Sequence, residues 1–168
     1  GKLHRNKDNK DKKSRLVGNL YAELHLFDGF MFKTSFGADY NNLYRRSFSP
    51  KYDEINASEK LSGLSNRNAW NFNWVFTNTL NYTKTFGDHT INALLGLESL
   101  RNRYEYFTAS RDGFPSDDPN FHFLDAGDVG TQKNSGSATE YSMVSYFGKI
   151  DYNYHDRYLV AFTLRRDG

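Results

Sequence analysis

The side chains with the clearest capacity to bind a ligand lie in a polar stretch, residues 112–138. Aromatic rings in this stretch offer flat apolar surfaces on which a sugar or a peptide can stack. Its aspartates supply the oxygen ligands that Ca²⁺ prefers, but their spacing does not match the EF-hand loop. We therefore expect either a ligand-binding ledge or a plain solvated loop here, and no metal site. The aromatic residues are Phe114, Phe121 and Phe123, and the aspartates are Asp117, Asp118, Asp125 and Asp128.

A second polar stretch, residues 41–69, contains aromatic and cationic side chains close together. Tyrosine and arginine are enriched at protein interfaces, where they combine a large contact area with hydrogen-bonding groups. This stretch is the second candidate contact region, and the alternative is again a solvated loop. The candidate contact residues are Tyr44, Arg45 and Tyr52, with Arg46 beside them.

The other polar residues do not form a pattern typical of an enzyme or of a nucleic-acid-binding protein. There is no Ser/His/Asp or Cys/His arrangement, no carboxylate pair beside a substrate cleft and no phosphate-binding glycine loop. The chain has no cysteine, which excludes disulfides and thiolate metal sites. Its net charge is only +2, and the basic stretch 2–15 has no aromatic residue among its cations. We expect no catalytic residue, no cofactor and no nucleic-acid partner.

The polar stretches are connected by segments in which apolar and polar residues alternate. Such alternation places one set of side chains on each face of a β-strand, and a two-residue polar turn joins two strands into a hairpin. The pattern predicts six strands in three antiparallel hairpins, and the first strand should begin near Val17. Residues 20–27 and 30–36 meet at Asp28-Gly29, residues 70–86 and 90–100 at Gly87-Asp88, and residues 141–154 and 158–164 at His155-Asp156.

The two faces of the predicted strands differ in polarity. In residues 70–85 the even positions from Trp70 to Phe76 are aromatic, whereas the odd positions are almost entirely asparagine and threonine. The same division recurs in residues 30–40 and 144–154. We expect the apolar face to contact lipid. The expected lipid-facing residues are Phe32, Phe36, Phe72, Trp74, Phe76, Tyr146, Ile150 and Tyr152.

These features favour an all-β, antiparallel transmembrane β-barrel over a soluble β-sandwich. A tilted strand needs about 9–11 residues to cross a bilayer, as in these runs, whereas most strands have about five or six. The aromatic content of 17% suits aromatic belts at membrane interfaces, and short turns alternating with long polar stretches are typical of outer-membrane barrels. Six strands cannot close around a lumen, so we expect a segment of a larger barrel. Asn78, Leu94 and Phe147 lie on the unexpected face and require a bulge or inward packing.

Several motifs resemble those of a known family. Residues 145–154 are similar to a Phe-Gly-(Arg/Lys)-x-(Asn/Asp)-Tyr strand of that family. The residues that follow are similar to its Asp-Arg-Tyr-Leu turn, at Asp156 to Leu159, and to its Arg-x-Asp-Gly strand end, within residues 163–168. Residues 32–40 and 103–115 also contain motifs similar to recurrent strands of that family. On these motifs, the chain resembles the SusC/RagA-type TonB-dependent outer-membrane transporters of Gram-negative bacteria.

The resemblance implies a barrel of about 22 strands with a plugged lumen. It also implies energised import of an oligosaccharide or a peptide, driven by TonB and assisted by a SusD-like surface lipoprotein lid. The barrel would lie among outer-membrane lipids and lipopolysaccharide, and residues 1–168 would be a partial receptor barrel without signal peptide, TonB box or plug domain. The alternatives are a passive porin-type barrel and a soluble all-β glycan-binding or adhesin module.

Overall fold

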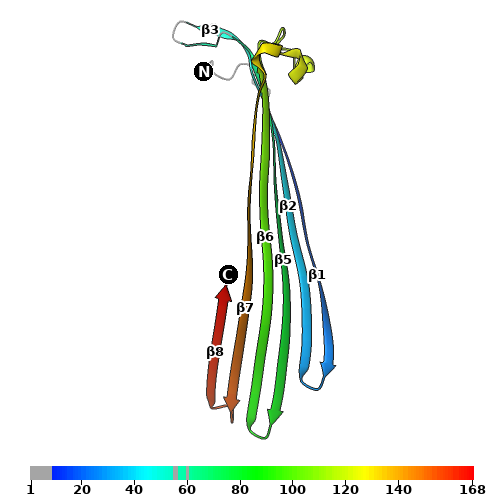
Figure 1. Ribbon diagram of the computed structural model, residues 1–168, viewed down its shortest axis with the longest axis vertical. Helices are drawn as coiled ribbons and strands as arrows, with labels where there is room; N and C mark the ends of the chain where they lie inside the picture. Colours follow the sequence, from blue (N-terminus) through cyan, green and yellow to red (C-terminus); the bar gives the residue numbers. More distant parts are fainter. Residues whose placement is uncertain (1–8, 55–56, 60) are drawn as a thin grey trace. The chain divides into compact units, whose positions relative to one another are not determined.

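The computed structural model, which describes residues 9–54, 57–59 and 61–168, consists mainly of β-strands. Six of them form one sheet in the order β1-β2-β5-β6-β7-β8, so that strands joined by a tight turn lie side by side (Figure 1). This topology confirms the predicted antiparallel sheet built from three hairpins. The sheet strands are β1 (Asn9–Phe27), β2 (Phe30–Ser49), β5 (Gly63–Phe86), β6 (His89–Asp112), β7 (Lys133–Tyr154) and β8 (Tyr158–Asp167).

The three tight turns lie where the alternation predicts, and their backbone explains the residues used. Gly29 and Gly87 have positive φ angles of 80° and 57°, and His155 and Asp156 have φ angles of 58° and 56°. Positive φ matches the twist of a tight hairpin turn. The third turn has three residues, 155–157, because Tyr154 pairs with Tyr158. At Gly29 a side chain is also excluded sterically, because a Cβ would lie 2.5 Å from the Thr83 carbonyl oxygen. Figure 1 shows all three turns at the same end of their hairpins.

The strands are longer than the sequence pattern predicts. The first strand begins at Asn9 and not near Val17, and most of the polar stretch 41–69 is strand, with a small β3 (Tyr52–Glu54) and β4 (Ala57–Glu59) hairpin. These boundary predictions were wrong because both faces are polar in this region, so alternation no longer marks a strand. The second polar stretch likewise narrows to residues 113–132, between β6 and β7.

The chain divides into two compact units. Unit 1 comprises Gly1–Arg15, Asn41–Asn71 and Tyr104–Thr139, and unit 2 comprises Leu16–Tyr40, Phe72–Arg103 and Glu140–Gly168. The units differ in the burial of their hydrophobic side chains. Those that are buried among the described residues all belong to unit 1, and unit 2 has no hydrophobic core within the described part of the chain. The buried hydrophobic residues are Phe48, Leu64, Ala69 and Phe114.

Contacts in unit 2 separate an apolar from a polar face. Phe36 stacks with Trp74 at a centroid distance of 6.3 Å, and Tyr40 meets Phe72 edge-on at 6.5 Å, so aromatic rings from β2 and β5 share one face. Side chains at the intervening positions pair with one another: Thr77 donates a hydrogen bond to Glu98, and Asn102 donates one to Asn73. The alternation read from the sequence therefore describes the two faces of this sheet.

Candidate functional site

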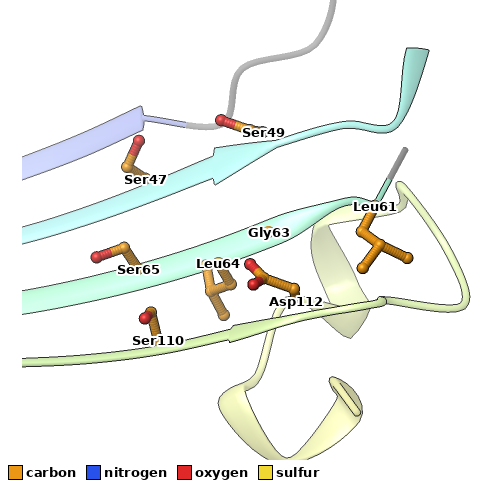
Figure 2. A pocket seen from close by; sticks show the side chains of 8 residues that line it. All are labelled: Ser47, Ser49, Leu61, Gly63, Leu64, Ser65, Ser110 and Asp112. Atoms are coloured by element: carbon orange, nitrogen blue, oxygen red, sulfur yellow. The ribbon is translucent and has the colours of Figure 1, made fainter. Parts of the chain in front are cut away.

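A hollow of about 340 Å³ lies in unit 1 and is lined mainly by hydroxyl groups. Figure 2 shows its serines on three strands, β2, β5 and β6, beside the carboxylate of Asp112. Serine hydroxyls both donate and accept hydrogen bonds, so this surface suits the hydroxyls of a sugar or the amides of a peptide. The lining residues are Ser47, Ser49, Leu61, Gly63, Leu64, Ser65, Ser110 and Asp112.

Arg67 follows Ser65 at the next position on the same side of β5, and two tyrosines of β6 hold it. Its Nη2 donates to the Tyr104 hydroxyl at 3.1 Å, and its guanidinium lies 4.1 Å from the centre of the Tyr106 ring. A cation over an aromatic face is stabilised by the ring quadrupole. This arrangement leaves further N–H donors of the half-buried guanidinium available to a polar ligand.

Arg45, a predicted contact residue, forms a two-pronged ion pair in unit 1. Its Nε and Nη2 each donate to an oxygen of Asp11 at 2.9 Å. These hydrogen bonds lower the pKa of Asp11 and raise the pKa of Arg45. The pair is therefore complete above the ordinary pKa of an aspartate and is lost only as the pH falls through the depressed value. Nearby Tyr44 is half-buried, and the side chain of Tyr52 lies outside the described part of the structure.

The segment between β6 and β7 is a folded loop with its own small core. Phe48 of β2 packs edge-on against Phe114 at 5.7 Å and stacks on the His122 ring at 3.6 Å. Ser62 fixes the start of the loop, since its hydroxyl accepts from the Phe114 N–H and donates to the Phe114 carbonyl. Leu124 completes this core, which lies on the side of β2 opposite to Ser47 and Ser49.

The aromatic residues predicted in this loop have different surroundings. Phe114 is 9% exposed and belongs to the core, whereas Phe121 and Phe123 are 57% and 67% exposed. A ligand can therefore reach the last two rings, while Phe114 has a structural role in holding the loop.

Three of the four aspartates of the loop have structural partners. Asp118 and Asp128 accept hydrogen bonds from the backbone N–H groups of Asn120 and Gly130 and so cap short 3-10 turns. Asp125 pairs with Arg111 at 3.2 Å. Within the described ranges, no group of three or more histidines or carboxylates is arranged to hold a metal ion.

The predicted lipid-facing residues all lie at the surface of unit 2. Tyr146 and Ile150 are 61% and 52% exposed, and Phe36, Phe72 and Phe76 are between 37% and 42% exposed. The remaining members, Phe32, Trp74 and Tyr152, are half-buried by neighbouring side chains. In the part of the chain that the structure describes, no helix is long and apolar enough to cross a membrane.

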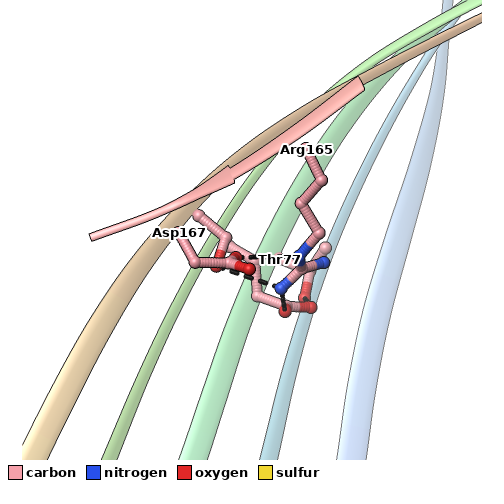
Figure 3. A network of polar contacts seen from close by, with 5 residues as sticks. Thr77, Arg165 and Asp167 are labelled. Carbon is pink, nitrogen blue, oxygen red and sulfur yellow. Dashed lines mark hydrogen bonds and ion pairs between the residues drawn. The ribbon is translucent and has the colours of Figure 1, made fainter. Parts of the chain in front are cut away.

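The polar face of unit 2 carries a network that ties four strands together (Figure 3). Arg165 of β8 donates to Glu98 at 3.0 Å, to Asp167 at 2.8 Å and to Ser145 at 3.0 Å. Thr77 of β5 also donates to Glu98, at 3.2 Å. Because the network joins side chains of four neighbouring strands, we assign it a structural role.

Phe147, an apparent exception to the alternation, has a specific place on this polar face. A Cβ at Gly96 would lie 2.1 Å from the Phe147 ring, and the Arg165 guanidinium lies 5.5 Å from the centre of that ring. Phe147 therefore fills the space that Gly96 leaves and is covered by Arg165. Inward packing, not a bulge, accommodates the residue.

Sequence reasoning missed the serine-lined hollow and Arg67. The serines occur at alternate strand positions, Ser47 and Ser49 on β2 and Ser65 near the start of β5, but within a stretch predicted to be loop. If the stretch 41–69 had been predicted as strands, alternation would have placed these serines on one face of the sheet.

Gly96→Ala should destabilise the full-length barrel by about 1–3 kcal/mol, because the added methyl group overpacks the Phe147 site. Urea unfolding of the full-length protein in detergent, followed by heat modifiability on gels, measures the change. Gly18→Ala is the matched control, since nothing lies within 4 Å of a Cβ there. Equal unfolding midpoints for the two variants would show that Phe147 does not pack on Gly96.

Comparison with known proteins gives relatives of one kind. TonB-dependent receptor P3 of Formosa agariphila is 32% identical over 151 residues, which cover 89% of this chain and 15% of the relative. TonB-dependent receptor P39 of the same organism is 30% identical over 149 residues, covering 88% of this chain and 14% of the relative. The chain thus spans about 15% of the length of these curated relatives. No protein-family model matches it.

Solved structures show the same fold. A chain of the RagAB peptide transporter superposes with a TM-score of 0.88 and 22% identity over 96% of this chain and 18% of that chain. The RagAB peptide importer in its 'open-open' state gives a TM-score of 0.88 at 23% identity, again over 96% of this chain. The matches in sequence and fold confirm the resemblance of the motifs: the chain is similar in sequence to part of proteins named TonB-dependent receptor, and it shares its fold with part of the RagAB structure.

Proposed function

We propose that this chain is a wall segment of an outer-membrane, TonB-dependent active importer of oligosaccharides or peptides in a Gram-negative bacterium. The observation that carries the proposal is the exposed apolar face of unit 2, which has no hydrophobic core within the described residues. A hydrophobic face of this kind needs an apolar environment, and lipid supplies it. The relatives named TonB-dependent receptor supply the transport class.

The polar face would then line the lumen and the entrance to it. In unit 1 this face carries the serine-lined hollow and Arg67, groups that can hydrogen-bond a sugar or a peptide. The solved relative is called a peptide transporter, but at 22% identity it supports the fold alone, so both substrate classes stay within the proposal.

The proposal includes two partner proteins, and it excludes a reaction on the substrate. A SusD-like surface lipoprotein would cover the loop end, where Phe121 and Phe123 are exposed, and TonB would act through a region outside this chain. A plug domain would fill the lumen beside the Glu98–Arg165 network. The relatives are receptors, which accords with a binding and transport role without catalysis.

Phe76→Arg in the full-length protein should impair barrel assembly far more than Thr77→Arg. The two positions are adjacent on β5 and point to opposite faces, and a charge is destabilising on the lipid face of a barrel but tolerated on the lumen face. The yield of heat-modifiable barrel in outer-membrane fractions measures assembly. Equal losses for both variants would contradict the lipid-facing assignment.

Both ends of the strands should be distinguishable on intact cells, because outer-membrane barrels have short periplasmic turns and longer outer loops. Cysteines introduced at Ser58 and Ser135 should react with a membrane-impermeant maleimide, whereas a cysteine at Asp88 should react only after lysis. The chain has no native cysteine to interfere. The opposite labelling pattern would invert the topology.

A further inference from the structure

We infer that Arg101 and Arg103, on the apolar side of β6, bind the phosphate groups of lipopolysaccharide in the outer leaflet. This inference rests on the proposed outer-membrane location. It concerns the lipid around the barrel and is separate from the transported substrate.

The face of the two arginines follows from the contacts of their neighbours. Glu98 and Asn102 lie on the polar face, where they bond to Thr77 and Asn73 of β5. Because side chains alternate along a strand, Arg101 and Arg103 lie on the other face, with Leu95 and Leu97.

Their height along β6 is the level at which the apolar row ends. Leu95 is 66% exposed and Leu97 is 38% exposed, and the arginine side chains beyond them are 47% and 45% exposed. Long cationic side chains at the edge of an apolar band place their charged ends among lipid headgroups.

Aromatic neighbours complete the surroundings. The Thr77–Glu98 and Asn73–Asn102 hydrogen bonds fix the pairing of β5 with β6. In this register Trp74 lies opposite Arg101 and Phe72 lies opposite Arg103. The arginines therefore border rings that can pack against acyl chains or a sugar headgroup.

The charge at this edge favours an anion. Arg101 and Arg103 share one carboxylate, that of Glu140, at 2.7 Å and 3.6 Å. Arg166 of β8 lies opposite Tyr146, on the same face but nearer the apolar row than Arg101 and Arg103. Glu105, two residues after Arg103 on β6, adds a second carboxylate. Positive charge remains in excess, and each guanidinium has five N–H donors in a geometry that matches phosphate oxygens.

The opposite edge of the apolar face has a different composition. Near the tight turns it is formed by rings: His89 bonds to the Tyr152 hydroxyl at 2.7 Å, stacks on Phe86 and contacts Tyr154. At the turn end the cation on this face, Lys84, is paired with Asp28, whereas at the loop end Arg101 and Arg103 share one carboxylate. This distribution of charge fits a membrane whose outer leaflet carries densely phosphorylated lipid. This asymmetry favours lipopolysaccharide over a phospholipid as the ligand.

The test uses the full-length receptor, purified, delipidated and kept in mild detergent. Native mass spectrometry compares its binding of diphosphoryl lipid A with that of the same lipid after removal of both phosphates. The wild-type protein should prefer the phosphorylated lipid, and R101Q/R103Q should reduce this preference by about tenfold or more, since each cation near a lipid surface contributes about 1 kcal/mol. R101K/R103K, which keeps the charge, should retain a measurable preference.

The matched control is K33Q/K149Q, which removes two cations from the polar face of the same unit and should leave the preference unchanged. The inference is overturned if wild type shows no preference, if R101Q/R103Q binds like wild type, or if the control loses as much. An equal loss of phosphatidylglycerol binding in R101Q/R103Q would overturn the assignment to lipopolysaccharide. Heat modifiability of each variant verifies assembly, and a wild-type protein that fails to assemble in the outer membrane would contradict the proposed function instead.

Discussion

Alternation of side chains across a single layer of sheet is the constraint on which the rest of this structure depends. In unit 2 the layer has no hydrophobic core among the described residues, so each face has to suit the environment directly beside it. One face presents aromatic and aliphatic side chains, and the other presents asparagines, threonines and paired charges. A shift of register by one residue would exchange the two faces, which is why local devices such as the Glu98–Arg165 network and the Phe147–Gly96 contact matter.

Unit 1 meets a different requirement. Its strands are polar on the side that carries Ser47 and Ser65, and its few buried hydrophobic side chains hold the loop 113–132 against β2 and β5. A small core of this kind gives a long loop a defined position, which a binding surface needs. The ordered loop presents the exposed rings of Phe121 and Phe123. On β5 the half-buried guanidinium of Arg67 is likewise held in a defined position.

The sequence predicted the features of unit 2 well. There each strand has one apolar and one polar face, so apolar and polar residues alternate along the sequence. The turns at Gly29, Gly87 and His155 and the two faces of β5 follow from this pattern and were confirmed. Beyond the apolar rows both faces are polar, the period disappears, and strand residues such as Ser47 and Ser65 were taken for loop. Phe114 was predicted as a ligand contact because it is an aromatic residue in a polar stretch. Its place in a small core depends on tertiary packing, which the sequence pattern does not reveal.

The most direct measurement of the central claim is solvent accessibility along β5. Nitroxide labels on single cysteines at positions 72–80 of the full-length barrel, reconstituted in lipid, report collision with oxygen, which partitions into lipid, and with a water-soluble nickel complex. We expect oxygen accessibility to peak at Phe72, Trp74 and Phe76 and to fall at Asn73, Val75 and Thr77, with a period of two. Equal accessibility at adjacent positions, or water exposure at both, would contradict the account of one sheet layer between two environments.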